Sequence, residues 1–214
     1  MPSEPKVARP GPRGGRADKR SAILAGALAV FARDGYTRAS IDAIATQASV
    51  STRTIYNHFT DKAHLFESVI EESAAGVADA RIAIMDRHLR KVTDLEADLI
   101  AFGRELASPD VRYADHVALV RQINADVGHI PPAALEAWQQ AGPARVRREL
   151  AAHLRRLDES GMLRVEDADA AALHLLLLLH GTVPANEGVT VVRDADIAAT
   201  VTAGVRAFLY GYAR

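Results

Sequence analysis

The stretch SVSTRTIYNHFTDK, residues 49–62, is central to interpreting this chain. It places a tyrosine, a histidine and basic residues among hydroxyl-bearing residues, directly after an alanine-rich segment with helical periodicity. Ser49-Val50-Ser51 is short enough for a tight turn. The pattern therefore predicts a short helix over 40–48, a three-residue turn and a second short helix over 51–58, which together form a helix-turn-helix.

The two short helices are predicted to bury their apolar sides, and the second helix is predicted to expose its polar side. Ile44, Ala45, Val50 and Ile55 are apolar and face a preceding helix expected over 18–34. The polar residues left outside carry donors and acceptors of the kind that can reach base edges in a major groove: Thr52, Arg53, Thr54, Asn57 and His58.

Hydroxyls and cations near helix N-termini suit phosphate oxygens, which the local N–H groups also attract. Arg53, Thr52, Thr54 and Asn57 are therefore predicted to contact bases, and Ser40, Tyr56, His58 and Lys62 to contact phosphates. The full set predicted to bind double-stranded DNA is Ser40, Ser51, Thr52, Arg53, Thr54, Tyr56, Asn57, His58 and Lys62. Taken singly, each residue also fits an ordinary solvated helical hairpin.

Charge is distributed unevenly along the chain. Residues 1–62 contain ten Lys and Arg against five Asp and Glu, whereas the remaining 152 residues contain sixteen against twenty-two. A basic head on an acidic body is consistent with a polyanionic partner for the head. Residues 1–17, rich in Pro, Gly and Arg, are expected to be a disordered basic arm, with Arg13 and Arg16 either following a minor groove or only aiding solubility.

Helical periodicity continues to the C-terminus, which predicts an all-α protein of about nine helices. The expected domains are the arm, a helix-turn-helix domain over 18–62 and a larger helical domain over 63–214. A long helix should begin at Asp61, and others should cover Pro143–Glu159, Asp167–Thr182 and Asp194–Tyr212. Residues 189–192 could form a strand, which would lack a partner.

Phe31, Gly35 and Tyr36, followed by SIDAIATQASVSTRTIYNHFTDKAHLF at 40–66, resemble the DNA-binding domain of the TetR family of transcription regulators. The resemblance covers about 45 residues. Ser49 departs from it, because the family usually has glycine at this turn, and serine tolerates a left-handed backbone less well. The resemblance implies a cytoplasmic homodimeric repressor of a roughly palindromic operator, released when an effector tilts the long helix.

Two apolar helices favour dimerisation independently of that resemblance. Residues 171–179 are apolar nearly all round, and the last helix offers a second apolar stripe, so two copies of both helices could pair as a four-helix bundle. The alternative is that they fill the core of one subunit. The candidate contacts for an unknown small-molecule effector are Phe102, Tyr113, His116, Val120, Trp138, His174 and Leu178.

Other functions find little support in the sequence. The chain has no cysteine, its histidines form no H-x-x-x-H pattern, and it has no P-loop or G-x-S-x-G motif. We therefore expect no enzyme activity, no metal, no cofactor and no membrane partner. A helical effector-binding protein that has lost DNA binding remains the alternative, with Ser49 in its favour.

Overall fold

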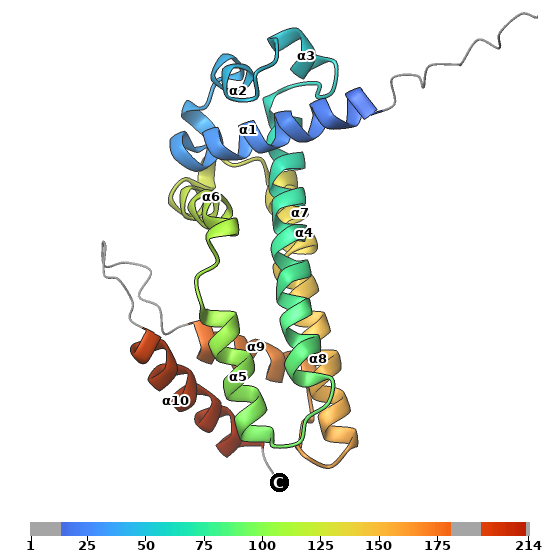
Figure 1. Ribbon diagram of the computed structural model, residues 1–214, viewed down its shortest axis with the longest axis vertical. Coiled ribbons are helices and arrows are strands. Elements are labelled where there is room, and N and C mark those ends of the chain that lie inside the picture. The colour runs from blue at the N-terminus through green and yellow to red at the C-terminus, as the bar shows by residue number, and fades with distance from the viewer. Residues whose placement is uncertain (1–13, 181–193, 213–214) are drawn as a thin grey trace, which may run out of the picture. The chain divides into compact units, whose positions relative to one another are not determined.

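The computed structural model describes residues 14–180 and 194–212, and the elements in these ranges are helices (Figure 1), which confirms the all-α class. The α-helices are α1 (Gly14–Arg38), α2 (Ile41–Gln47), α3 (Thr52–Tyr56), α4 (Lys62–Leu89), α5 (Leu95–Ala107), α6 (Ala114–Ala125), α7 (Pro132–Ala141), α8 (Pro143–Glu159), α9 (Ala168–His180) and α10 (Asp194–Tyr212). Two short 3-10 helices, η1 (Val111–Tyr113) and η2 (Val127–His129), flank α6.

The first helix begins earlier than expected, at Gly14, so residues 14–17 of the predicted disordered arm are helical. At its other end, Gly35 leaves helical geometry with φ 75 and ψ 168, so the regular helix is interrupted at the residue after the predicted end, and a short helical turn beyond this kink continues to Arg38. Residues 1–13 of the arm, and the possible strand at 189–192, lie outside the described residues.

The described residues fall into two compact units, and the division differs from the expected domains. One unit comprises residues up to Val69 together with Asp115–Ala134, and the other comprises Ile70–Ala114 and the residues from Leu135 onward. The first unit therefore contains the helix-turn-helix and also α6, η2 and the start of α7.

The first unit is built on a core of aromatic and branched side chains. Phe31 meets Phe66 edge to face, with ring centroids 4.9 Å apart, and Ile44 is fully buried. Gly26 allows α1 and α2 to approach closely, since a Cβ there would lie 2.9 Å from the Cβ of Ala48.

The segment 115–134 is joined to the end of α1. Asp126 accepts hydrogen bonds from the hydroxyl of Thr37 at 2.8 Å and from Nδ1 of His129 at 2.6 Å. A Cβ on Gly35 would lie 3.2 Å from the side-chain oxygen of Gln122 on α6. Glycine is favoured at position 35 because of its positive φ, and a side chain there would also require Gln122 to shift slightly.

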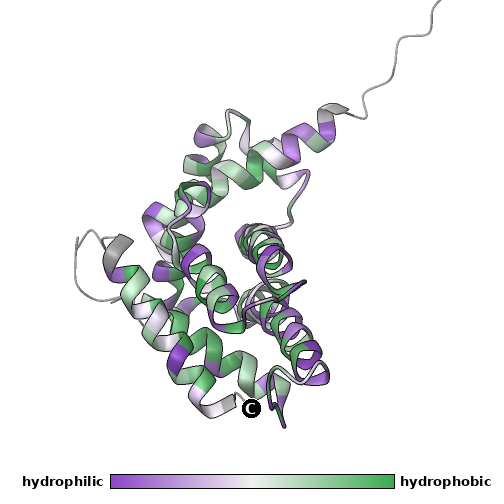
Figure 2. Cartoon of the chain, turned by 60° about the horizontal axis from the view of Figure 1, so that its bottom comes forward, coloured by the Kyte–Doolittle hydropathy of each residue, from purple (hydrophilic) through white to green (hydrophobic). Residues whose placement is uncertain are grey.

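The second unit is held by a continuous apolar core from α4, α5, α8, α9 and α10. Packing is tight enough that a Cβ on Gly103 of α5 would lie 2.7 Å from side-chain atoms of Leu179 and Val201. The helices nearest the C-terminus are largely green in Figure 2, in keeping with this core. Among the described residues, no helix is both long enough and apolar enough to span a bilayer.

Candidate nucleic-acid interface

The turn between α2 and α3 is a complete Schellman motif. The N–H of Val50 donates to the carbonyl of Ala45 at 3.0 Å, and the N–H of Ser49 donates to that of Thr46 at 3.2 Å. This motif needs a left-handed residue after the helix cap, and Ser49 supplies it with φ 54. Ser49 therefore adopts the left-handed backbone at which strain was expected, and the turn forms nonetheless.

Two serines cap the helices of the motif. The hydroxyl of Ser40 accepts from the N–H of Ala43 at 3.1 Å, which caps α2. The hydroxyl of Ser51 accepts from the N–H of Thr54 at 3.1 Å and lies 2.9 Å from the Thr54 hydroxyl, which caps α3. Both hydroxyls thus satisfy helix N-terminal donors, and this fixes where α3 begins.

One side of α3 is buried and the other is open, as the sequence predicts. Ile55 is 1% exposed and Phe59 is 2% exposed, whereas Tyr56 is 55% exposed. Arg53 and Asn57 are exposed. Within the described part of the chain, no side-chain hydrogen bond is recorded for either of them, so their donors are available to another molecule.

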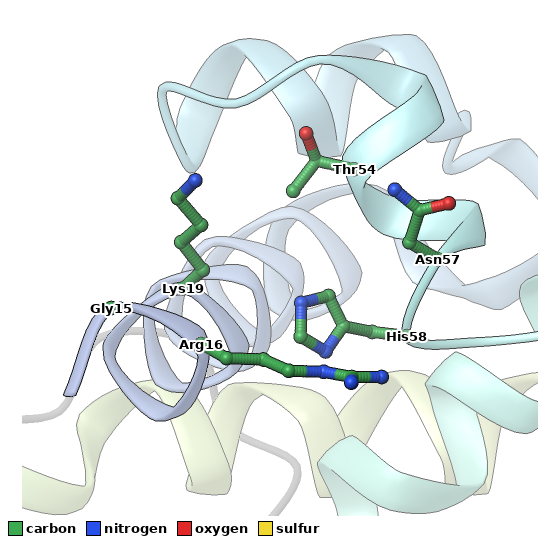
Figure 3. A pocket seen from close by; sticks show the side chains of 6 residues that line it. All are labelled: Gly15, Arg16, Lys19, Thr54, Asn57 and His58. Carbon is green, nitrogen blue, oxygen red and sulfur yellow. The ribbon is translucent and has the colours of Figure 1, made fainter. Parts of the chain in front are cut away.

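An open hollow of about 570 Å³ lies beside this face of α3. Thr54, Asn57 and His58 line it from α3 and the residues that follow (Figure 3). Gly15, Arg16 and Lys19 line the other side, from the first turns of α1.

The two cations that line the hollow, Arg16 and Lys19, lie on helix α1 and are not part of a disordered arm. The sequence had placed Arg16 in a flexible arm and had not singled out Lys19. Their spacing of three residues, which places them on one face of a helix, was the available signal.

Lys62 has a different environment from the one predicted. Its ammonium donates to the carbonyls of Tyr36 at 2.9 Å, Ala39 at 3.1 Å and Thr37 at 3.3 Å. It also lies 4.7 Å from the centroid of the Tyr36 ring. These carbonyls are at the end of α1, where helix acceptors lack partners, so Lys62 closes that helix and a phosphate would have to compete with three acceptors.

The candidate effector residues are distributed over both units. His116 and Val120 belong to the first unit, and the other five belong to the second. Phe102 is fully buried in the second core, against which Leu178 packs, whereas His174 is exposed. The hollow described above contains none of the seven.

The chain resembles known regulators over parts of its length. It is 42% identical over 65 residues to the DNA-binding transcriptional repressor TetR of Mycobacteroides abscessus, covering 30% of this chain and 34% of that one. It is 34% identical over 86 residues to the HTH-type transcriptional activator FasR of Mycolicibacterium smegmatis, covering 40% and 37%. The chain thus spans about a third of the length of these curated relatives.

Similarity extends over nearly the whole chain for a solved structure. A TetR-family transcriptional regulator from Mesorhizobium loti has a TM-score of 0.82 and 29% identity, covering 95% of this chain and 100% of that one. Residues 23–69 match the family described as bacterial regulatory proteins, tetR family, and residues 97–214 match the AefR-like transcriptional repressor C-terminal domain. The chain belongs to the TetR family of bacterial regulatory proteins.

Proposed function

We propose that this protein is a homodimeric transcription regulator that inserts α3 of each subunit into the major groove of a roughly palindromic operator. The observation that carries the proposal is the open face of α3, where Arg53 and Asn57 stand free next to a hollow lined by two cations. Bases are read by such unpaired donors, and phosphates are attracted by such cations.

The contacts divide between bases and backbone. Thr52, Arg53, Thr54 and Asn57 are proposed to read base edges. Phosphate contacts are assigned to Tyr56 and His58 and, newly, to Arg16 and Lys19. Ser40 and Ser51 support the helix ends on which those contacts depend, and Lys62 is reassigned to closing α1.

Dimerisation is proposed through α9 and α10. Leu173 is 41% exposed and Leu177 60% exposed, four residues apart on one face of α9, and Tyr210 on α10 is 96% exposed. Leucines in such a row favour a partner. A two-fold dimer would place its recognition helices about one helical turn of DNA apart, roughly 34–36 Å, or a multiple of it.

The protein is further proposed to repress its target and to be released by a small molecule. Repression is favoured by the match of residues 97–214 to a repressor domain, although the relatives include an activator. For a useful response the effector must favour the form that does not bind DNA by about 1–3 kcal/mol.

The test is selection of a binding site from random duplex DNA, followed by fluorescence anisotropy at about 50 and 200 mM salt. Arg53→Ala should weaken operator binding by about 1–3 kcal/mol and relax the preference at one base pair. Arg164→Ala, at an exposed arginine of the second unit, is the matched control and should bind as the wild type does. A chain that selects no sequence and ignores duplex DNA at low salt would instead be the effector-binding protein without DNA binding.

A further inference from the structure

Arg81 of α4 is a cation at an apolar position of the second unit. It is half-buried, and its helical neighbours Ala78 and Met85 are both fully buried. Burial lowers the pKa of Arg81. The guanidinium remains charged in this setting, because the pKa of arginine lies far above neutral pH.

Two other arginines of the same unit have carboxylate partners. Arg145 pairs with Asp79 at 2.7 Å, and Arg206 pairs with Glu96 at 2.8 Å. For Arg81, no ion pair or hydrogen bond to another described residue is recorded. Arginine is rarely buried unless it is paired, because a desolvated charge without a partner is unfavourable.

The position of Arg81 on α4 indicates which way it faces. Ala74, Arg81 and His88 are seven residues apart and therefore share one face of the helix. At one end of this face, a Cβ on Gly142 at the α7–α8 junction would lie 3.1 Å from that of Ala74. At the other end, Nε2 of His88 is 2.7 Å from a carboxylate oxygen of Glu105 on α5. Arg81 thus lies on the face of α4 that is turned toward α5 and the α7–α8 junction.

We propose that Arg81 is the counter-ion for a small organic carboxylate with an apolar body, bound within the second unit. This rests on the effector response proposed above and gives that effector a chemical class. A carboxylate accepts two parallel hydrogen bonds from a guanidinium, which restores the solvation that burial removed. Ile84, three residues along the same helix, is apolar and only partly buried beside the core, which favours an apolar remainder over a polar one.

The experiment uses the full chain without DNA and two probes, decanoate and 4-phenylbutanoate, each compared with its primary amide. Calorimetric titration and thermal unfolding are measured for the wild type, for Arg81→Met and for Arg145→Met. Methionine keeps an unbranched stem while removing the charge. Arg145 is the control, since it lies on the same unit but is already paired with Asp79.

At least one carboxylate should bind the wild type and the Arg145 variant about tenfold or more tighter than its amide. The Arg81 variant should lose that preference and, without ligand, should unfold at the same temperature as the wild type or higher. The proposal is overturned if neither carboxylate is preferred over its amide, or if Arg81→Met lowers the unfolding temperature as loss of an ion pair would. Because DNA is absent, neither result bears on operator binding.

Discussion

At the scale of single residues, Ser49 shows what a local pattern can and cannot predict. Serine stands at position 49 where the family usually has glycine, which predicts a strained backbone, and Ser49 does adopt φ 54. A left-handed backbone costs a residue with a Cβ roughly 1–2 kcal/mol. The hydrogen bonds of Val50 and Ser49 to the preceding helix offset this cost, and their formation could not be deduced from residue types alone.

Lys62 was assigned from the sequence to a phosphate because it lies near a helix N-terminus. Its actual acceptors were missed because the end of α1, which supplies them, is distant in the chain. Lys62→Met should lower the free energy of unfolding by about 1–2 kcal/mol, since three carbonyls lose a charged donor. The salt dependence of DNA affinity should stay unchanged. Urea unfolding and anisotropy against salt concentration measure the two effects.

Lys19→Met is the matched variant for that experiment, because Lys19 is an exposed lysine that lines the hollow. It should leave stability unchanged and reduce the salt slope by about one. The opposite assignment, with Lys62 reducing the slope and Lys19 having no effect, would restore the phosphate contact to Lys62.

At the scale of elements, helix ends were predictable where the sequence punctuates them strongly. Pro143 and the Ser160-Gly161 pair bound α8, and both ends of α8 are found where expected. The start of α1 was missed because Gly14 and Gly15 have low helix propensity. Periodicity thus predicted which segments are helices, but it did not predict where a helix with a glycine-rich end begins.

The joint between α4 and α5 predicts a pH dependence. Glu105 pairs with His88 and with Arg87, and these hydrogen bonds, His88 first, hold the pKa of Glu105 below its ordinary value of 4.5. A carboxylate with a lowered pKa stabilises the fold above pH 4.5, and this stabilisation is lost as pH falls through its folded pKa. Glu105→Gln should therefore reduce stability more at pH 6 than at pH 3.

Urea unfolding at the two pH values measures this, with Glu136→Gln as the control. Glu136 is an exposed glutamate of α7 for which the described residues provide no recorded partner. A Glu105 variant whose deficit is the same at both pH values would show that the side chain contributes by packing and not by charge.

At the scale of the whole molecule, the proposed dimer can be tested through α9. Leu177→Asp should weaken self-association at least about a hundredfold, because two copies of the leucine each lose about 1.5 kcal/mol or more of burial. Operator affinity should fall with it. Analytical ultracentrifugation over a concentration series measures the change.

Val111→Asp tests whether exposure alone matters, because Val111 on η1 is 87% exposed but lies outside α9 and α10. It should sediment as the wild type does. If Leu177→Asp also remains dimeric, the subunits associate through another surface.

The division into units was the least predictable property of the chain. Changes of composition along the chain predict a domain boundary near residue 62. The first unit instead also includes Asp115–Ala134, a segment distant in the chain that is joined to α1 by contacts such as the hydrogen bond from Thr37 to Asp126. The hollow was missed for the same reason, because it needs α1 and α3 side by side.

That recruitment has a consequence for synthesis on the ribosome. The first unit cannot be complete when Val69 has been made, because Leu119 and Ile123, both buried, are still to come. At 5–20 residues per second, the nascent chain must wait about 3–13 s between Val69 and Ala134. During that interval the incomplete first unit exposes apolar side chains, to which a chaperone can bind.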